Sequence, residues 1–538
     1  MGRLILLLLL FAPVCVAFFI PDNHDYYKKL AVAHMRKKLD SDFGKKMMRL
    51  EAPPKKVILF VGDGMGLTAV KGARVAINQK NNVADVDEPL FFETFPWSGI
   101  VKTACHNLHV TDSAAAAITH YTLGRKPGKG DQCEKTEDAK INDGITDHAV
   151  LKGFSVGVVS TAAITDATPA AAYAKDVHRY MMFDSDKEMK KGTKCIDIAR
   201  QALMPPADKF KVLFGGGKKF FTPKGVDGGV RTDGKNLIED FKKGKNHFVV
   251  TNKNQLDGHT VEMDQQVLGL FAPKDMTYKV EDDEYKNGTA PSLKDMTMKA
   301  LEILEKQSNS LGYFLLVEGA LIDKAEHENR FAFAQEETEE FDKTIQEVSK
   351  NVGDDTLMLV TADHSHALAI LGMWYKNHSI YEQDMAMTNL SQILFATGPG
   401  KYMWSKGKNI VIDGTKMRDP ETFRFDAEEA NNKFFVNPAA KTLGYNVHGG
   451  EDVGIWAKGP YAWLFSGTIE NTQIAHGIKY LMCLTEENIC DLRAQNAQGI
   501  SSPFILIIMI LSVYSLSFFY SFGIHSSTIP VPATEDLS

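Results

Sequence analysis

Four short apolar runs, most of them rich in β-branched residues, stand out along the chain. They cover residues 57–61, 155–159, 313–317 and 356–360. Each run lacks a clear alternation of apolar and polar positions, which is typical of strands buried on both faces of a sheet. We therefore predict four buried strands.

Helical patterns lie between these runs, at residues 146–152, 292–307 and 336–350. Strands that alternate with helices predict an α/β fold with a central, mainly parallel sheet flanked by helices. Two stretches interrupt this alternation. Residues 216–260 are rich in Gly, Lys and Asp, and we predict surface loops there. Residues 370–445 are irregular, and we predict an insertion that forms a cap or crown at one end of the sheet.

Composition supports a large folded protein rather than a disordered chain. The 538 residues are 44% hydrophobic and 24% charged, which is ample for a large core. The formal net charge is −7 and there is no basic block. Nucleic acid is therefore not expected as the main partner.

The N-terminus has the pattern of a secretory signal peptide over residues 1–17. Arg3 supplies the positive charge, residues 4–14 are apolar, and residues 14–17 resemble a cleavage site. A short buried helix is the alternative. Residues 18–50 then form a predicted N-terminal helical arm ahead of one large domain at residues 51–490. An extracellular location agrees with three glycosylation sequons, which begin at Asn287, Asn377 and Asn389.

A second apolar run occupies residues 504–524 near the C-terminus, after a polar spacer at 491–503. At about 1.5 Å per residue, a helix of this length would cross a bilayer. The tail at 504–538 is therefore either a lipid-anchor (GPI) signal that is removed or a retained transmembrane span. Residues 525–538 contain no Lys or Arg, which favours the removed signal. We expect a protein that follows the secretory pathway to the extracellular face of the plasma membrane.

Carboxylates and histidines follow the predicted strands at the points where the strands end. Because the carboxyl ends of parallel strands share one edge of a sheet, these side chains should converge there. Converging carboxylates repel one another unless cations lie between them. Mixed Asp/His sets suit Zn²⁺, and sets of oxygen ligands suit Mg²⁺. Each residue alone has a plain structural explanation, such as a turn or a surface pair, so the joint occurrence carries the argument. The residues are Asp63, Glu318, Asp323, His327, Asp363 and His364.

Ser113 precedes four consecutive alanines, residues 114–117. Alanine is the strongest helix former, so Ser113 is expected at a helix N-terminus. Serine is a common N-cap, which is the structural interpretation. The functional interpretation is that the free N–H groups of a helix N-terminus attract phosphate and stabilise an oxyanion.

Taken together, these motifs resemble those of the alkaline phosphatase family, of the animal, membrane-bound and insect-like type. Residues 110–117 resemble its nucleophile signature, although Ile118 stands where the family usually has Thr. The other matching blocks are residues 61–66, 166–169 with Arg179, 317–320 with Asp323 and His327, 361–364, and 448–452. The resemblance runs from about residue 50 to 490, and the combination is highly specific.

The resemblance implies hydrolysis of phosphate monoesters through a phosphoserine intermediate on Ser113, with Arg179 binding the phosphoryl group. It also implies two Zn²⁺ and one Mg²⁺ per subunit. One zinc would be held by Asp323, His327 and His448, and the second by Asp63, Asp363 and His364; the magnesium would be held by Asp63, Thr168 and Glu318.

Two departures from the family pattern are informative. Asp166 and Lys324 stand where animal members commonly carry His, and this resembles the bacterial arrangement around the third metal. We expect an ion pair between them that restrains the outer shell of the magnesium site. Vertebrate relatives have a further calcium site, and Ala272 and Ala290 stand where its acidic residues are expected. We therefore predict no tight calcium site.

The resemblance further implies two disulfides and a homodimer. The disulfides are Cys133–Cys195 and Cys483–Cys490, with Cys105 outside any pair. In the dimer, the amphipathic segment at residues 25–39 would embrace the partner subunit. Two other functions are considered. A related phosphodiesterase would commonly use Thr as its nucleophile and lack Arg179 and the magnesium ligands. The complete ligand sets argue against a surface receptor that has lost catalysis, although an active enzyme could also serve as a binding surface for other proteins.

Overall fold

The computed structural model describes most of the chain between residues 24 and 494. The described residues are 24–106, 108–119, 144–175, 178–189, 195–285, 288–308, 311–372, 375–376, 378–381, 392–399, 402–405, 408–413, 416–418, 432–486 and 488–494. The predicted signal peptide, Cys133, the three sequon asparagines and the apolar tail lie outside them. Within these ranges, every helix is too short or too polar to cross a membrane.

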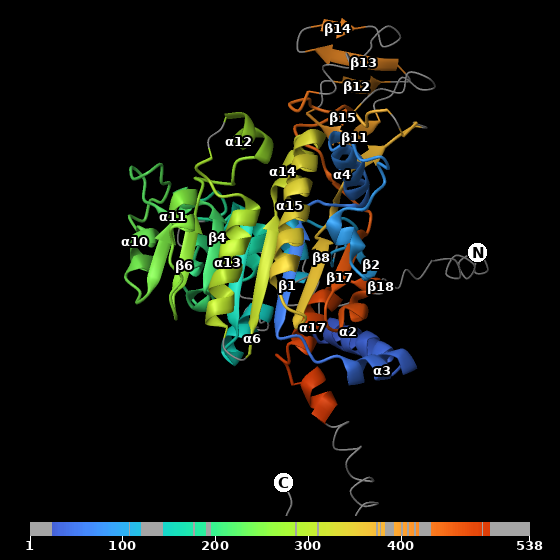
Figure 1. The fold of residues 1–538 in the computed structure, drawn as a ribbon. Helices are drawn as coiled ribbons and strands as arrows, with labels where there is room; N and C mark the ends of the chain where they lie inside the picture. The colour runs from blue at the N-terminus through green and yellow to red at the C-terminus, as the bar shows by residue number, and fades with distance from the viewer. Residues whose placement is uncertain are drawn as a thin grey trace, which may run out of the picture.

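A ten-stranded sheet forms the centre of the structure (Figure 1). Strand β17 runs antiparallel to both of its neighbours, and all other neighbouring pairs are parallel. The four predicted strands are neighbours at its middle, and the predicted mainly parallel α/β fold is confirmed. In spatial order the strands are β18 (Gly467–Glu470), β2 (Trp97–Lys102), β17 (Val453–Lys458), β8 (Thr356–Ala362), β1 (Lys56–Gly62), β7 (Tyr313–Gly319), β3 (Ser155–Ala163), β4 (Val212–Gly216), β6 (Gln266–Leu270) and β5 (His247–Val250).

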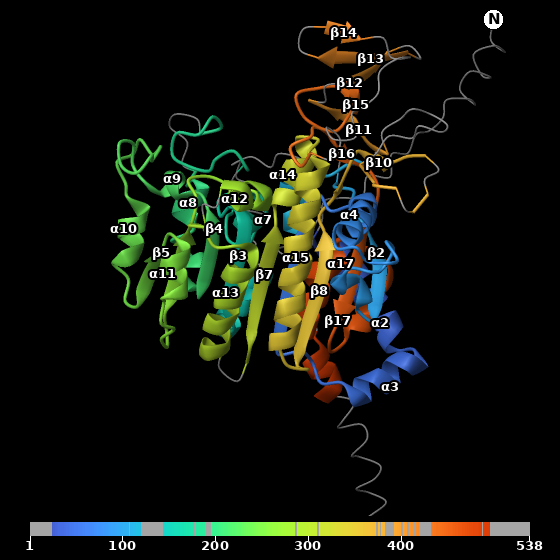
Figure 2. The ribbon, with the colours of Figure 1, turned by 45° about the horizontal axis from the view of Figure 1, so that its top comes forward.

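Helices cover this sheet, as the strand–helix alternation predicts. Figure 2 shows α13 (Leu293–Gln307) and α15 (Phe331–Asn351) lying along one face of the sheet. Helix α13 begins after Ser292, whose hydroxyl accepts a hydrogen bond from the Asp295 N–H. Helix α15 begins before the predicted residue 336, because its first turn buries Phe331 and Phe333. Further helices are α4 (Leu67–Lys80), α6 (Ile145–Lys152), α8 (Ile198–Gln201), α9 (Lys218–Phe221), α12 (Lys279–Tyr285) and α17 (Thr472–Leu481).

The prediction of surface loops at residues 216–260 is wrong in part. This stretch contains strand β5 and three short helices, α9, α10 (Leu237–Lys242) and α11 (Lys253–Asp257). Asn236 and Asn252 cap α10 and α11. The high Lys and Asp content of the whole stretch concealed β5, although Phe248, Val249 and Val250 of this edge strand are apolar and pack in or against the core.

The predicted cap is present at one end of the sheet, and it is built from small sheets rather than from irregular chain. Figures 1 and 2 show its strands stacked beyond the main sheet, above helix α4. One sheet contains β10 (Leu368–Ile370), β11 (Ile393–Gly398) and β15 (Ala439–Thr442). A second contains β12 (Tyr402–Ser405), β13 (Lys408–Asp413) and β14 (Lys416–Arg418).

The N-terminal arm consists of α2 (His24–Leu39) and α3 (Asp42–Leu50). The side chains of Tyr27, Ala31, Met35 and Leu39 recur every four residues along α2 and are all buried. Helix α2 packs on α17 of the same chain. The apolar stripe of the arm is therefore used within its own subunit.

Cysteine pairing agrees with the family resemblance wherever the structure describes it. Cys483 and Cys490 form a disulfide. Cys195 is also disulfide-bonded, and its expected partner lies outside the described residues. Cys105 keeps its thiol, with Sγ 3.6 Å from the carbonyl oxygen of Leu108.

Candidate active site

Three neighbouring strands deliver carboxylates to one edge of the sheet. Asp63 directly follows β1, Glu318 is the penultimate residue of β7, and Asp363 directly follows β8. The parallel register sets Val61 beside Glu318 and Gly62 beside Ala362. All three carboxylates are buried. The structure therefore brings together the residues that the strand-end pattern singled out.

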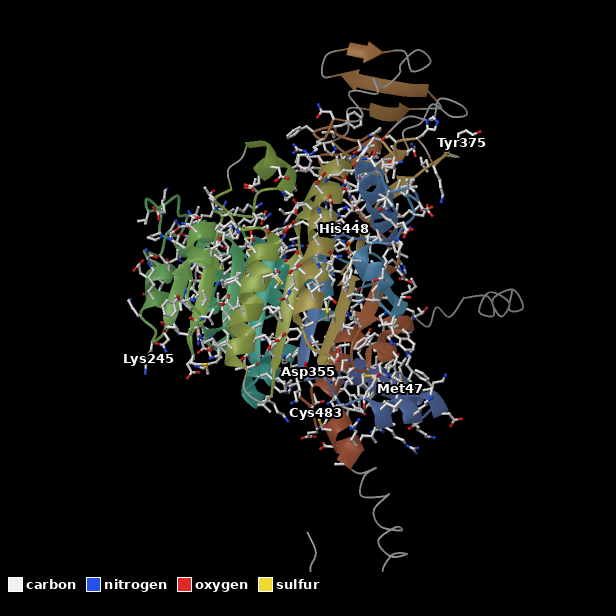
Figure 3. The ribbon with its side chains drawn as sticks, in the orientation of Figure 1. Met47, Lys245, Asp355, Tyr375, His448 and Cys483 are labelled. Atoms are coloured by element: carbon white, nitrogen blue, oxygen red, sulfur yellow. A yellow bond between two sulfur atoms is a disulfide. The ribbon has the colours of Figure 1, made fainter. Side chains whose placement is uncertain are left out.

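The first metal-competent cluster contains Asp323, His327, His366 and His448, whose ligand atoms all lie within 4.8 Å of one another. Helix α14 (Leu321–His327) presents Asp323 and His327 one turn apart, with Asp323 Oδ1 3.4 Å from His327 Nε2. His448 comes from β16 (His448–Gly449), which pairs with β9 (Ser365–His366). Figure 3 labels His448 at the end of the main sheet that faces the cap.

The expected histidine ligands are oriented by backbone carbonyl groups. His327 Nδ1 lies 2.7 Å from Asn446 O, and His448 Nδ1 lies 2.9 Å from Thr111 O. His364 Nδ1 lies 3.3 Å from Ser365 O. A ring that donates from Nδ1 keeps the lone pair of Nε2 for a metal. These hydrogen bonds thus assign the same ligand nitrogen to all three rings.

His366 is a member of this cluster that the sequence analysis did not single out. Its Nε2 lies 2.6 Å from Asp323 Oδ1, and Asn446 Nδ2 lies 3.2 Å from its Nδ1. Because an amide nitrogen only donates, Nδ1 accepts and Nε2–H donates to the carboxylate. His366 therefore orients Asp323. Its position two residues after His364 was the available signal.

The second cluster contains Asp63, Asp363 and His364. His364 Nε2 lies 3.5 Å from Asp63 Oδ1 and 3.3 Å from Asp363 Oδ2. Ser113 lies against this cluster, with Oγ 3.3 Å from His364 Nε2 and 3.5 Å from Asp63 Oδ1. The nucleophile expected from the motif is therefore beside a metal-competent group.

Ser113 opens helix α5 (Ser113–Ala117) but is not its N-cap. The cap is Asp112, whose side chain accepts a hydrogen bond from Ala115 N. Because Asp112 performs the capping, the Ser113 hydroxyl is left to face the cluster. The simple N-cap interpretation of Ser113 is thus wrong.

Gly64 allows the two clusters to approach each other. It has a φ of +74°, and its N–H donates to Asp363 Oδ1 at 3.0 Å. A Cβ at this position would lie 2.8 Å from the ring of His366. Only glycine meets both requirements without strain.

A third group of polar side chains surrounds Glu318. Thr168 lies in the first turn of α7 (Ala167–Ala171), which Asp166 caps, and its side chain interacts with Glu318. Ser160 on β3 donates a hydrogen bond to Glu318 Oε2. Arg179 Nη1 lies 3.4 Å from Asp112 Oδ2, which sets its guanidinium beside the residue that precedes Ser113.

Burial shifts the pKa values of the strand-end carboxylates upward. It raises the pKa of Glu318 to about 8 and that of Asp363 to about 7. Burial also raises the pKa of Asp63 well above its ordinary value, and repulsion from Asp323, Asp363 and Glu318 adds to the shift. These three carboxylates are therefore costly to ionise together without added positive charge.

The histidines shift in the opposite sense. Burial lowers the pKa of His448 to about 4, and burial followed by repulsion from His448 lowers the pKa of His364 well below its ordinary value. Both rings are neutral near physiological pH, which is the form that binds metals. Asp323 differs: burial opposes its ionisation, but His327 and His366 hold its pKa well below the ordinary range.

The donor sets fit the expected metals. Buried carboxylates with mutually raised pKa values require cations, and neutral imidazoles with free Nε2 lone pairs suit zinc. The oxygen groups of Asp63, Thr168 and Glu318 suit magnesium. All eight expected ligand residues are among the described residues, and all of them lie at this edge of the sheet.

The protein has an open α/β sheet with metal-competent clusters at its carboxyl edge, and Ser113, the first residue of helix α5, lies beside them. These features define the class of metal-dependent α/β enzymes. The comparisons with known proteins give the family. The family model described as alkaline phosphatase matches residues 54–484, and the chain belongs to this family. It is thus a phosphoric monoester hydrolase.

Relatives support this assignment over most of the chain. A membrane-bound alkaline phosphatase from Bombyx mori is 32% identical over 465 residues, which cover 80% of both chains. The human tissue-nonspecific isozyme of alkaline phosphatase is 33% identical over 467 residues, covering 80% of this chain and 84% of that protein.

Solved structures agree. A cold-active alkaline phosphatase from Shewanella sp. is 27% identical with a TM-score of 0.56, covering 80% of this chain and 100% of that one. The Thermus thermophilus alkaline phosphatase is 22% identical with a TM-score of 0.57 and coverage of 82% and 94%; at this identity it supports the fold alone.

Proposed function

We propose that this enzyme hydrolyses phosphate monoesters in two steps, through a phosphoserine intermediate on Ser113. The main observation in support is the position of Ser113 Oγ, which lies 3.3 Å from His364 Nε2 and 3.5 Å from Asp63 Oδ1. A hydroxyl beside such a cluster can be activated as a nucleophile, which a free serine is not.

The two clusters and the oxygen groups around Glu318 support a proposed ligand assignment for three metal ions. Asp323, His327 and His448 would hold one Zn²⁺, and Asp63, Asp363 and His364 a second; Asp63, Thr168 and Glu318 would hold the Mg²⁺. When bound, these ions lower the pKa of coordinated hydroxyl groups and neutralise charge on the phosphoryl and leaving-group oxygens.

The residues of the chain perform the remaining tasks. Ser113 Oγ loses its proton to water and forms a bond to phosphorus as the bond from phosphorus to the leaving oxygen breaks, and the departing alkoxide takes a proton from water. A water molecule then attacks phosphorus and releases a proton, and Ser113 Oγ leaves and is protonated again. Arg179 offers two parallel N–H donors to phosphoryl oxygens, a geometry that lysine lacks. These contacts recognise the phosphoryl group and not the alcohol part of the substrate. We therefore expect broad specificity among phosphate monoesters.

Two properties of the protein outside the site are also proposed. The tail at residues 504–538 would direct a lipid anchor, so that the enzyme acts on the extracellular face of the plasma membrane. The B. mori relative is named as membrane-bound, which supports attachment to a membrane. We also propose a homodimer, which the resemblance implies.

The test compares the expressed ectodomain with its Ser113→Ala variant. Phosphate release from a chromogenic monoester and from a matched diester is measured, and bound zinc is quantified in both proteins. We expect monoester activity in the wild type, and loss of most of it in the variant with zinc retained. If both proteins bind zinc fully and neither releases phosphate, the catalytic proposal fails and a binding role replaces it.

A further inference from the structure

Ser160 is a fully buried serine near the end of β3, and both hydrogen-bonding roles of its hydroxyl are in use. Ala162 N donates to Ser160 Oγ at 2.8 Å. Ser160 Oγ also contacts Glu318 Oε2. A serine hydroxyl carries a single proton. Because Oγ already accepts from Ala162, that proton is directed at the Glu318 carboxylate.

The sheet explains why the two side chains meet. In the parallel pairing of β3 with β7, Ser160 is the register partner of Glu318. The two side chains consequently project from the same face at adjacent positions. Their contact is set by the register and not by rotamer choice alone.

A local irregularity in β3 supplies the third group. The pairing of β3 with β4 shifts register between Val159 and Ala163. Such bulges take backbone groups out of the ladder and re-aim side chains, often beside active sites. Here the displaced N–H of Ala162 is turned onto Ser160 Oγ, where it orients the hydroxyl.

We propose that Ser160 is a positioning residue that holds the Glu318 carboxylate in the orientation required by the magnesium site. This inference rests on the proposed function, which assigns Glu318 to Mg²⁺. Ser160 itself touches neither the Ser113 hydroxyl nor the histidine cluster among the contacts of the described residues. Its effect should therefore fall on magnesium rather than on zinc.

The neighbouring hydroxyl makes contacts of a different kind. Thr161 Oγ1 accepts hydrogen bonds from Ala320 N at 2.9 Å and from Leu321 N at 3.3 Å. It thus supports the start of α14, the helix that carries Asp323 and His327. The adjacent positions 160 and 161 therefore serve different parts of the site.

The test uses the expressed ectodomain and three variants. Ser160→Ala removes the hydroxyl, and Ser160→Thr keeps one. The matched control is Ser155→Ala, because Ser155 is a buried serine at the opposite end of the same strand, where Oγ donates to Gln307 O at 3.3 Å. The dissociation constant for Mg²⁺ is measured by equilibrium dialysis of the zinc-loaded proteins, with zinc content measured in the same samples.

Loss of a residue that orients a metal ligand typically weakens metal binding by about 10- to 100-fold. We expect a loss of this size for Ser160→Ala, with zinc content unchanged and activity regained at high Mg²⁺. Ser160→Thr should retain tighter binding than Ser160→Ala, and Ser155→Ala should match the wild type.

Two outcomes would overturn the inference. One is a Ser160→Ala protein with the wild-type Mg²⁺ affinity. The other is equal loss of zinc and magnesium from it, which would indicate a general structural role. If the wild type itself binds no Mg²⁺, the magnesium part of the proposed function fails together with this inference. If the wild type binds Mg²⁺ and Ser160→Ala binds it equally well, this inference is rejected and the proposed function is not.

Discussion

Lys324 Nζ lies 2.6 Å from Asp166 Oδ2, so the ion pair expected from the departure in the family motif is present. Arg179 Nη2 lies 3.2 Å from the other oxygen of the same carboxylate. Burial opposes ionisation of Asp166, but Lys324 and Arg179 hold its pKa well below the ordinary range. One buried anion thereby links the guanidinium expected to bind phosphate to helix α14, which carries expected metal ligands.

Replacing Asp166 by His should change both turnover and magnesium dependence. The imidazole cannot accept from Lys324 and Arg179 at once, so the guanidinium loses a partner that orients it. We expect changes of about 10-fold both in kcat and in the Mg²⁺ concentration for half-maximal activity, by analogy with other groups behind metal ligands. Steady-state kinetics across a magnesium titration measures both. Unchanged kinetics would reject the role of the ion pair.

Replacing His366 by Ala should weaken the binding of one zinc. The variant removes the N–H that donates to Asp323 Oδ1, and a ligating carboxylate without its partner is less well oriented. We expect the affinity for one of the two zinc ions to be about 10- to 100-fold weaker than in the wild type, so that a chelator removes this ion first. Zinc content after graded chelator dialysis measures this. His378→Ala changes a histidine outside both metal-competent clusters, so it serves as the control and should retain both ions. Equal zinc loss from the two variants would contradict the assignment.

The enzyme should hold no stoichiometric calcium after dialysis. Ala272 is buried and Ala290 packs against the core, so neither position offers an oxygen side chain. Among the described residues, the groups of three or more metal-competent side chains are the two at the strand ends. Elemental analysis of the dialysed protein measures calcium directly. One tightly held calcium per subunit would refute this prediction.

Glu337 should make the folded state less stable as the pH rises. Its Oε1 accepts from Lys279 N at 2.6 Å, and burial raises the pKa of Glu337 from 4.5 to about 8. A raised pKa in the folded state contributes stability below pH 4.5 that is lost as pH rises through 8. This loss amounts to about 5 kcal/mol at most.

The Glu337→Gln variant keeps an acceptor and cannot ionise, so its unfolding free energy should fall less between pH 5 and pH 9. Denaturant unfolding at the two pH values, with the same metal supply, measures the difference. Glu347→Gln, on the same helix with a side chain that is 41% exposed, should behave like the wild type. Identical pH dependence for Glu337→Gln and the wild type would contradict the prediction.

Much of the fold and site could be predicted because the relevant signals are local. Asp63 and Asp363 follow strands whose apolar runs are continuous, and a parallel sheet brings such strand ends to one edge. The helix start at Ser113 follows from the alanines after it. By contrast, β5 was not predicted, because its apolar run covers only Phe248 to Val250 and lies inside a stretch that is rich in Lys and Asp.

The sequence by itself determined the strands, the edge of the sheet where chemistry occurs and the types of residue that gather there. It also determined the family, through motifs that keep their order over most of the chain. Only the tertiary structure decided which atoms meet: that Asp112 and not Ser113 caps α5, that His366 donates to Asp323, and that Ser160 faces Glu318. The physical reason is that periodicity and turn preferences depend on neighbours along the chain. Hydrogen bonds between distant segments depend on sheet register and on bulges, which no single segment encodes.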